Sequence, residues 1–178
     1  ILNNSSFRLF GRVRTLILET LETKDEKIEK GLGFLGSLSP GDVLVVKGSP
    51  DYAYFGELMT RLSNEIGVSG AIIDGLTRDS FFTQKVNFPV FSKGYTSRDI
   101  KGRGRVGEID KRIIIQSTEV NSFDYVFGDS DSVVFVPKQI LNTLLEKVNQ
   151  EAKVEKNIKE MIKDGKSIKD ILKVTDSF

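Results

Sequence analysis

The stretch of sequence that decides the fold runs from Gly67 to Asp79 and reads GVSGAIIDGLTRD. Its centre, residues 71–73, is a short apolar run of the kind that forms a fully buried strand. A turn ends this run, and Arg78 and Asp79 follow just beyond it. Because ligands of an open α/β sheet bind beyond the carboxyl ends of its strands, the stretch predicts a central strand and a candidate site together.

Alternating helices and strands are predicted on both sides of this stretch. In chain order they are a strand over 7–19, a helix that starts at 23–26 and ends at Gly36, a strand over 43–46, a helix over 55–66, the strand over 71–73, a short helical or turn segment after Asp79, and a strand over 89–91. In the second helix we expect Phe55, Leu58, Met59, Leu62 and Ile66 to form the buried face. This βαβαβ order predicts a mixed α/β fold whose early strands are parallel.

The later part of the chain predicts antiparallel strands and then helix. The strands are expected over 112–115, 125–127 and 133–136, and Pro137 opens a long helix that Gly165 breaks before a short helix over 168–172. Between the two parts, residues 98–112 carry six basic and three acidic side chains among several glycines. With so little aromatic interleaving, we interpret 98–112 as a solvated loop or an inter-subunit contact rather than a phosphate or RNA site.

Composition restricts the chemistry further. The 178 residues have no histidine, cysteine or tryptophan, and 26 basic against 25 acidic side chains give a net charge of +1. The chain therefore cannot build a structural zinc site, a His-dependent nucleophile or a disulfide framework. Carboxylates, lysine, arginine, backbone amides and hard cations remain, and a Schiff-base lysine stays open. The near-neutral charge also argues against a dedicated nucleic-acid partner.

No apolar run approaches the roughly 20 residues that span a bilayer, and the first ten residues do not resemble a signal peptide. We therefore expect a cytoplasmic protein without a membrane partner. The length predicts one domain over 1–178. Since the sequence starts at Ile1 and not at methionine, this domain could be truncated at its N-terminus or cut from a longer protein.

Arg78 and Asp79 suit a site for an anionic substrate and a hard cation. Aspartate offers an oxygen ligand to Mg²⁺, and arginine offers a planar fork for a carboxylate or enolate oxygen. The helix start near Gly56 presents free backbone amides that can bind a carboxylate. The simpler interpretation is that Arg78 and Asp79 only cap a helix and form a surface ion pair, which is common in proteins.

These residues belong to a set of pieces that resembles a known family. The pieces are residues 40–46 (PGDVLVV), 55–58 (FGEL), 67–75 (GVSGAIIDG), 77–79 (TRD), 88–94 (FPVFSKG) and 128–134 (GDSDSVV), together with the C-terminal helix and its break at 165–167. In this order they are similar to proteins related to the regulator of ribonuclease E activity A, the RraA-like family. That family includes the class II 4-hydroxy-4-methyl-2-oxoglutarate aldolases.

The resemblance implies a swivelling β/β/α fold with a mixed sheet, a parallel βαβαβ part and a long C-terminal helix. It also implies a homotrimer or hexamer with sites between subunits. The implied activity is that of a divalent-metal-dependent lyase acting on a small 2-keto acid, either an aldolase or an oxaloacetate decarboxylase, with pyruvate as the common product. The implied cofactor is Mg²⁺ or another divalent metal such as Mn²⁺.

The resemblance also implies residue roles. Asp79 would hold the metal, largely through waters, and Arg78 would contact the keto oxygen and stabilise the enolate. The backbone of Gly56, Glu57, Leu58 and Met59 would bind the substrate carboxylate, and the Glu57 side chain would position a water as acid or base. Glu155 of a neighbouring subunit is the expected match to a catalytic glutamate of the C-terminal helix.

One position departs from the aldolase pattern, which continues from the Arg-Asp pair through two residues to a second acidic residue. Here that position is Phe82. A lost carboxylate lowers the negative charge available to a metal. Phe82 therefore supports an alternative, a non-catalytic trimeric regulator that binds another protein such as a ribonuclease.

Overall fold

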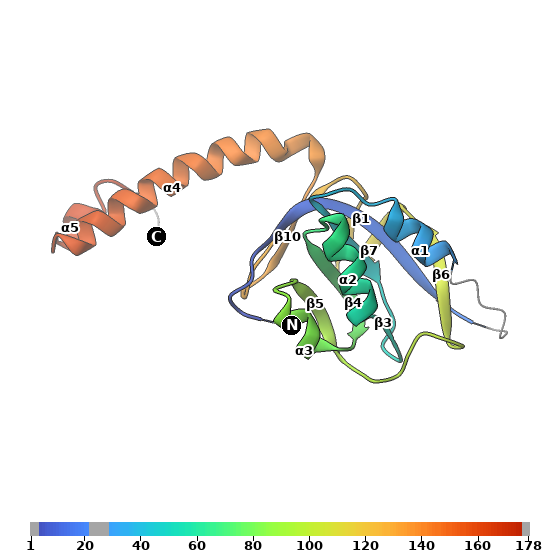
Figure 1. The fold of residues 1–178 in the computed structure, drawn as a ribbon. Coiled ribbons are helices and arrows are strands. Elements are labelled where there is room, and N and C mark those ends of the chain that lie inside the picture. The colour runs from blue at the N-terminus through green and yellow to red at the C-terminus, as the bar shows by residue number, and fades with distance from the viewer. Residues whose placement is uncertain (1–3, 22–28, 176–178) are drawn as a thin grey trace. The chain divides into compact units, whose positions relative to one another are not determined.

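The computed structural model describes residues 4–21 and 29–175, so the predicted helix start at 23–26 lies outside the described residues. The chain divides into two compact units, one up to Lys138 and one from Gln139. Within the described residues of the first unit, eight strands form one mixed sheet in the order β10-β9-β1-β2-β4-β3, with β5 beside β4 and β6 beside β1 (Figure 1). The predicted mixed α/β fold is confirmed.

The parallel part of the sheet contains the stretch that opened the sequence analysis. Its strands are β1 (Leu9–Thr20), β2 (Asp42–Lys47), β3 (Ala53–Phe55), β4 (Gly70–Thr77) and β5 (Val90–Tyr95). β2 is parallel to β1 and to β4, and β3 and β5 are parallel to β4. The expectation of parallel early strands is therefore confirmed, with β4 in the interior of the sheet.

Three helices connect these strands: α1 (Glu29–Gly36), α2 (Glu57–Ile66) and α3 (Ser80–Lys85). α1 and α2 lie next to each other on one face of the sheet (Figure 1). Gly67, in the left-handed region with φ 84°, ends α2, and its N–H donates to the Asn64 carbonyl. Glycine takes that conformation at little steric cost, which is why the helix stops where the sequence predicts.

Each face of β4 contributes to its own hydrophobic cluster. Ala71 and Ile73 belong to the cluster on the side of α1 and α2, whereas Ile72 belongs to the opposite cluster, together with Phe91. Successive side chains of a strand point to opposite faces, so a strand covered on both faces needs an uninterrupted apolar run. The same alternation places Asp74 among the lining of a cavity on the Ile72 side.

The buried face of α2 matches the expected one only in part: Phe55 is buried, and Met59 and Ile66 pack against the same cluster. Leu58 and Leu62 are exposed, to 72% and 44%, whereas the helix buries Thr60 and Ser63. The Thr60 hydroxyl is satisfied within the helix because it donates to the Gly56 carbonyl at 2.8 Å. Thr60 can therefore lie against the sheet at low cost, whereas the buried Ser63 hydroxyl has no hydrogen-bond partner among the described residues. Two leucines are left on the outer surface.

The antiparallel part of the sheet also confirms the prediction. It adds β6 (Gly104–Ile109), β9 (Tyr125–Gly128) and β10 (Val133–Val136), while β7 (Ile113–Ile115) and β8 (Thr118–Val120) form a separate hairpin. β6 and β9 both run antiparallel to β1, and β10 runs antiparallel to β9.

The interpretation of 98–112 as a solvated loop was wrong for its second half, since residues 104–109 form β6. Gly104 lies against the ring of Tyr52, so close that a Cβ atom there would clash with the ring and its phenol oxygen. The glycine that looked like a loop residue is thus required for a strand to pass an aromatic ring.

The second unit is helical, as predicted. A short 3₁₀ turn (Lys138–Ile140) leads into α4 (Leu141–Lys163), and α5 (Ile168–Ile171) follows after Gly165. The Ser167 hydroxyl caps α5 by accepting a hydrogen bond from the Asp170 N–H. Within the described ranges, no helix has the length and apolar character needed to cross a membrane.

Candidate functional site

Arg78 and Asp79 lie in the short connection between β4 and α3, beside the N-terminus of α2. Asp79 has φ 56° and ψ 36°, in the left-handed region. A non-glycine residue pays roughly 1 kcal/mol or more for this conformation, and such residues concentrate at functional sites. Aspartate enters this region more readily than most residues, and Asn87, Asp110, Gln116 and Phe123 also have a positive φ, so the conformation orients Asp79 but does not by itself identify a site.

The carboxylate of Asp79 turns away from its own helix. It makes no capping bond to α3, and its Oδ2 instead accepts a hydrogen bond from the Glu57 N–H at 2.9 Å. Gly56 permits this approach, because a Cβ there would lie 2.5 Å from Asp79 Oδ2 and 2.8 Å from Arg78 Cγ. The simple interpretation of a helix cap is thus partly correct, but the capped helix is α2 and not α3.

Arg78 pairs mainly with a residue that sequence reasoning missed. Its Nη1 donates to Asp99 Oδ2 at 2.5 Å, while its Nε is 3.6 Å from Asp79 Oδ2. Asp99 reaches this place because the chain around it bridges to β3: the Ala53 N–H donates to the Arg98 carbonyl. No local pattern could have linked Asp99 to Arg78, since only the pairing of two distant segments brings them together.

The charge of Asp99 is fixed by its surroundings. Partial burial alone would raise the pKa of this carboxyl, but hydrogen bonds from the Lys101 N–H and the Arg78 guanidinium outweigh burial and lower the pKa below its ordinary value. Asp99 therefore stays ionised at neutral pH and holds Arg78 in one orientation.

Glu57, the predicted acid or base, has a partner in the next helical turn. Its Oε1 accepts from Arg61 Nε at 2.9 Å and from Arg61 Nη2 at 2.7 Å. The Arg61 guanidinium also lies 4.2 Å from the centre of the Phe82 ring, in cation–π geometry. Phe82, the residue that replaces an acid of the aldolase pattern, thus makes a cation–π contact with Arg61.

The predicted carboxylate-binding amides are only partly available. Asp79 occupies the Glu57 N–H, whereas the N–H groups of Leu58 and Met59 belong to the first turn of α2 and have no partner within the helix. The Glu57 N–H is therefore not free for a substrate carboxylate, whereas the N–H groups of Leu58 and Met59 are available.

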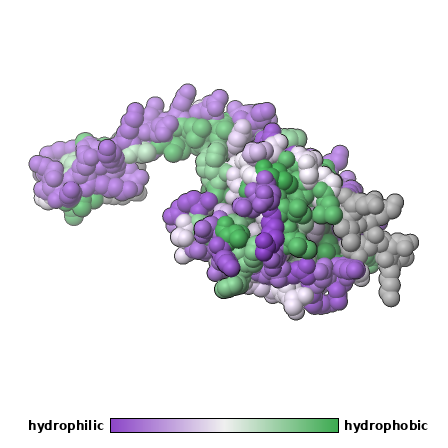
Figure 2. Space-filling view, in the orientation of Figure 1, coloured by the Kyte–Doolittle hydropathy of each residue, from purple (hydrophilic) through white to green (hydrophobic). Residues whose placement is uncertain are grey.

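Two cavities adjoin Arg78. A polar one of about 370 Å³ is lined by Arg78, Asp79 and residues 95–97. An apolar one of about 600 Å³, which we call the α2 pocket, has walls formed by Tyr54, Leu58, Met59, Leu62, Ile100 and Val106. Figure 2 shows hydrophobic surface over α1 and α2 next to a hydrophilic stripe. Arg78 therefore separates a polar space from an apolar one.

The donor set near Asp79 suits a hydrated cation. In the part of the chain that the structure describes, no three acidic side chains lie close enough together to hold a metal by themselves. The contacts of Asp79 use Oδ2, which leaves Oδ1 as the oxygen for a ligand. Mg²⁺ commonly binds through one or two carboxylates while keeping several waters, so Asp79 fits a water-rich site and not an all-protein cage.

Glu155 lies on α4, in the other compact unit. Its carboxylate pairs with Lys159 at 2.6 Å, and both side chains are exposed. Its role at the site of a neighbouring subunit stays a prediction.

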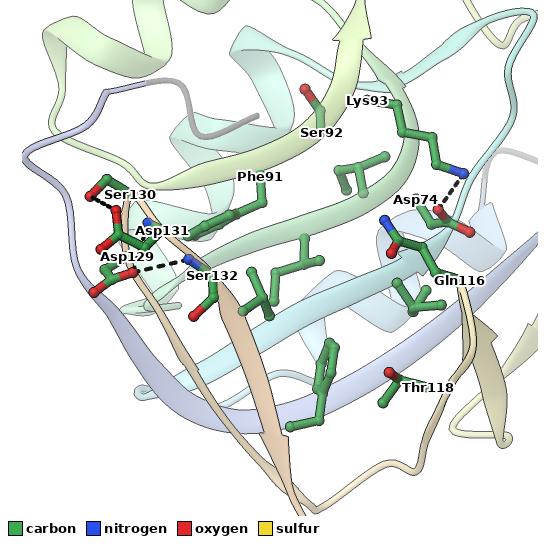
Figure 3. A pocket seen from close by; sticks show the side chains of 15 residues that line it. Asp74, Phe91, Ser92, Lys93, Gln116, Thr118, Asp129, Ser130, Asp131 and Ser132 are labelled. Carbon is green, nitrogen blue, oxygen red and sulfur yellow. Dashed lines mark hydrogen bonds and ion pairs between the residues drawn. The ribbon is translucent and has the colours of Figure 1, made fainter. Parts of the chain in front are cut away.

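A third cavity, of about 440 Å³, lies on the opposite face of β4 (Figure 3). At one end, the buried Asp74 carboxylate pairs with Lys47 and with Lys93, each at 2.5 Å. At the other end, Asp129 accepts hydrogen bonds from the N–H groups of Asp131 and Ser132. None of the predicted site residues lines this cavity.

Comparisons with known proteins agree with this geometry. A sequence profile of the RraA-like family, described as Aldolase/RraA, matches residues 2–135. A protein of Halalkalibacterium halodurans named as a candidate 4-hydroxy-4-methyl-2-oxoglutarate aldolase is 32% identical over 63% of this chain and 54% of its own length. One of Bacillus cereus with the same name is 31% identical over 76% of this chain and 86% of its own length.

The chain thus spans about half the length of the Halalkalibacterium relative. Among solved structures, RraAS2 of Streptomyces coelicolor, described as an unusual member of the RNase ES inhibitor RraA family, has a TM-score of 0.80 at 21% identity. That alignment covers 88% of this chain and 80% of RraAS2, and it shows a shared fold. With the profile match over three quarters of its residues, the chain belongs to the RraA-like family.

Proposed function

We propose that this chain is a divalent-metal-dependent lyase that cleaves a carbon–carbon bond beside a 2-keto acid. The observation that carries the proposal is the pair Arg78 and Asp79, with the Asp79 carboxylate turned onto the N-terminus of α2, next to the amides of Leu58 and Met59. Relatives named as candidate aldolases support the reaction class. The candidate substrates are 4-hydroxy-2-keto acids and oxaloacetate.

Each residue of the site has a role in this reaction. The N–H groups of Leu58 and Met59 bind the substrate carboxylate at the positive end of α2. Arg78, oriented by Asp99, donates to the keto oxygen, where negative charge develops as the bond breaks. A donor aimed at developing charge lowers the barrier more than it tightens ground-state binding.

Asp79 would hold the metal, Mg²⁺ or Mn²⁺, which when bound supplies a Lewis acid for the same developing charge. Glu57 would accept or deliver a proton through a water. Its carboxylate is anchored by Arg61, so only the oxygen that Arg61 does not use, Oε2, faces this task.

The test measures pyruvate release from oxaloacetate and from 4-hydroxy-2-keto acids, with and without MgCl₂. We expect metal-dependent turnover that Asp79→Ala abolishes. Asp131→Ala, which removes an exposed acid in the cavity of Figure 3, is the matched control and should keep full activity. Turnover that is absent, or that survives in Asp79→Ala, would contradict the proposal.

A second candidate function follows from Phe82. Where the aldolase pattern has an acid, this chain has an aromatic ring under Arg61, and RraAS2 is described as belonging to a family of RNase ES inhibitors. In this alternative the chain is a non-catalytic, oligomeric regulator of another protein. Capture of purified ribonuclease E, undiminished by Asp79→Ala and accompanied by no lyase activity, would favour the regulator over the enzyme.

A further inference from the structure

The α2 pocket is continuous with the proposed site. Arg78 and Asp99, the ion pair that faces the keto oxygen in the proposed reaction, both line it. Leu58 and Met59, whose amides are free for a carboxylate, contribute their side chains to its wall. A ligand bound at Arg78 therefore has an apolar cavity of about 600 Å³ next to its carbon chain.

The pocket exposes more apolar surface than the fold requires. Leu58 and Leu62 occupy outward-facing positions of α2, and Leu32 of α1 faces the same space with 49% of its surface exposed. Tyr54 adds an aromatic ring, and burial raises the pKa of its phenol above the ordinary value, so the hydroxyl stays neutral at physiological pH. Contiguous exposed apolar surface of this kind marks a binding site.

The rim of the pocket carries paired charges. Its lining includes the cations Arg61, Arg78, Lys101 and Arg105, of which Arg61 pairs with Glu57, Arg78 with Asp99 and Arg105 with Glu19. The selectivity of the pocket itself therefore rests on its apolar floor, and the acid group of a ligand is bound outside this floor, at Arg78 and the amides of α2.

Phe82 lies outside the lining of the pocket but contacts Arg61, which is part of it. Its ring lies 4.2 Å from the Arg61 guanidinium, which also pairs with Glu57. In place of the acid of the aldolase pattern, the chain thus has an aromatic ring that contacts Arg61 beside the pocket.

We propose that the α2 pocket receives the side chain of the substrate, so that the site prefers 2-keto acids with a branched apolar substituent over short dicarboxylic ones. This inference rests on the proposed function for the placement of the keto acid group at Arg78. The apolar walls at Leu58 and Leu62 determine the preference.

The size of the preference follows from the buried carbon atoms. Each buried methylene strengthens binding by about 0.8 kcal/mol, or roughly fourfold. 4-Methyl-2-oxopentanoate has three more carbon atoms than pyruvate. Because burial in an open pocket is incomplete, we expect it to bind at least roughly tenfold tighter than pyruvate, and also tighter than 2-oxoglutarate, whose second carboxylate would have to enter the apolar floor.

Titration calorimetry of the full chain in MgCl₂ with these three unreactive ligands tests the preference. Leu62→Ser should reduce it to less than about threefold while leaving pyruvate affinity unchanged. Leu172→Ser, which changes another exposed leucine in the other compact unit, is the matched control and should keep the full preference. Equal or tighter binding of 2-oxoglutarate, no binding of 4-methyl-2-oxopentanoate, or a preference that survives Leu62→Ser would overturn the inference.

A second copy of this chain could cover the same apolar surface, and gel filtration of the same variants tests this alternative. If Leu62→Ser changes the oligomeric state and the wild type shows no ligand preference, the pocket is a subunit contact and the inference is wrong. The binding readout is independent of turnover. A ligand preference without metal-dependent pyruvate release would contradict the lyase activity but not the pocket assignment. Turnover without a ligand preference would contradict the pocket assignment but not the lyase activity.

Discussion

Asp74 lies within the central strand β4 and Asp79 lies just past its end, yet the two carboxylates occupy opposite environments. The Asp74 side chain is 3% exposed and pairs with two lysines, whereas the Asp79 side chain is 41% exposed and sits 3.6 Å from one arginine. Asp74 belongs to β4 and contributes to the cavity in Figure 3; Asp79 follows the strand in a left-handed conformation. Both carboxylates have cationic partners, but only Asp79 keeps an oxygen, Oδ1, that these contacts do not use.

The difference separates a structural carboxylate from one that can bind a ligand. Two cations compensate the charge of Asp74, and each of its oxygens has a lysine partner, Lys47 at Oδ2 and Lys93 at Oδ1. One oxygen of Asp79 accepts a hydrogen bond from a backbone amide, and the side chain remains accessible to solvent. If this distinction is right, substitutions beside Asp79 should mainly change turnover, whereas substitution of Asp74 should mainly change stability.

The largest effect is expected for the arginine beside Asp79. Arg78→Ala should lower the proposed lyase turnover by roughly 10²- to 10³-fold, because it removes a donor to the developing charge. The stability should change by less than about 1 kcal/mol, since the Arg78 ion pairs are about one-third exposed. Steady-state pyruvate release and urea denaturation measure the two effects, and Arg78→Lys, which keeps the charge without the planar fork, is the control.

The second effect is on stability. Asp74→Asn should cost about 2 kcal/mol, because two lysines lose a charged hydrogen-bond acceptor; their partial exposure limits the cost. Asp79→Asn should cost no more than about 0.5 kcal/mol, since asparagine tolerates the left-handed conformation and retains an acceptor. Equal free energies of unfolding for the two variants would break the comparison.

A third effect concerns pH. Burial alone would raise the pKa of Asp74, but hydrogen bonds and charge from Lys47 and Lys93 outweigh it and lower the pKa below its ordinary value. A depressed pKa in the folded state means that the stabilisation is present above the unfolded pKa and is lost as pH falls through the folded one. The stability difference between wild type and Asp74→Asn should therefore be constant from neutral pH to about pH 5 and shrink below about pH 4, as followed by urea denaturation across pH.

The smallest effect is expected in the other compact unit. Glu155→Gln should change the free energy of unfolding by less than about 0.5 kcal/mol, because its ion pair with Lys159 is exposed on both sides. Turnover of the same variant is the informative readout. A lowered turnover at unchanged stability would support the predicted role at a neighbouring site, and an unchanged turnover would contradict it.

Much of the site region was predictable from local pattern. The buried strand, the helix ending at Gly67 and the placement of Arg78 and Asp79 past a strand end all follow from short-range rules. Asp99 was not predictable, because its contact with Arg78 depends on pairing with β3. The outward position of Leu58 and Leu62 was also missed, since Thr60 and Ser63 took the buried face that an apolar stripe normally occupies.

By itself, the sequence determined the fold class, the absence of histidine and cysteine chemistry, and the residue types available near the end of β4. These properties depend on composition and on periodicities of two and 3.6 residues, which act over short distances. Only the tertiary structure decided which acid is buried, which amide Asp79 occupies and which cation Phe82 supports. Those outcomes require segments far apart in the chain to meet, and no local pattern encodes such a meeting.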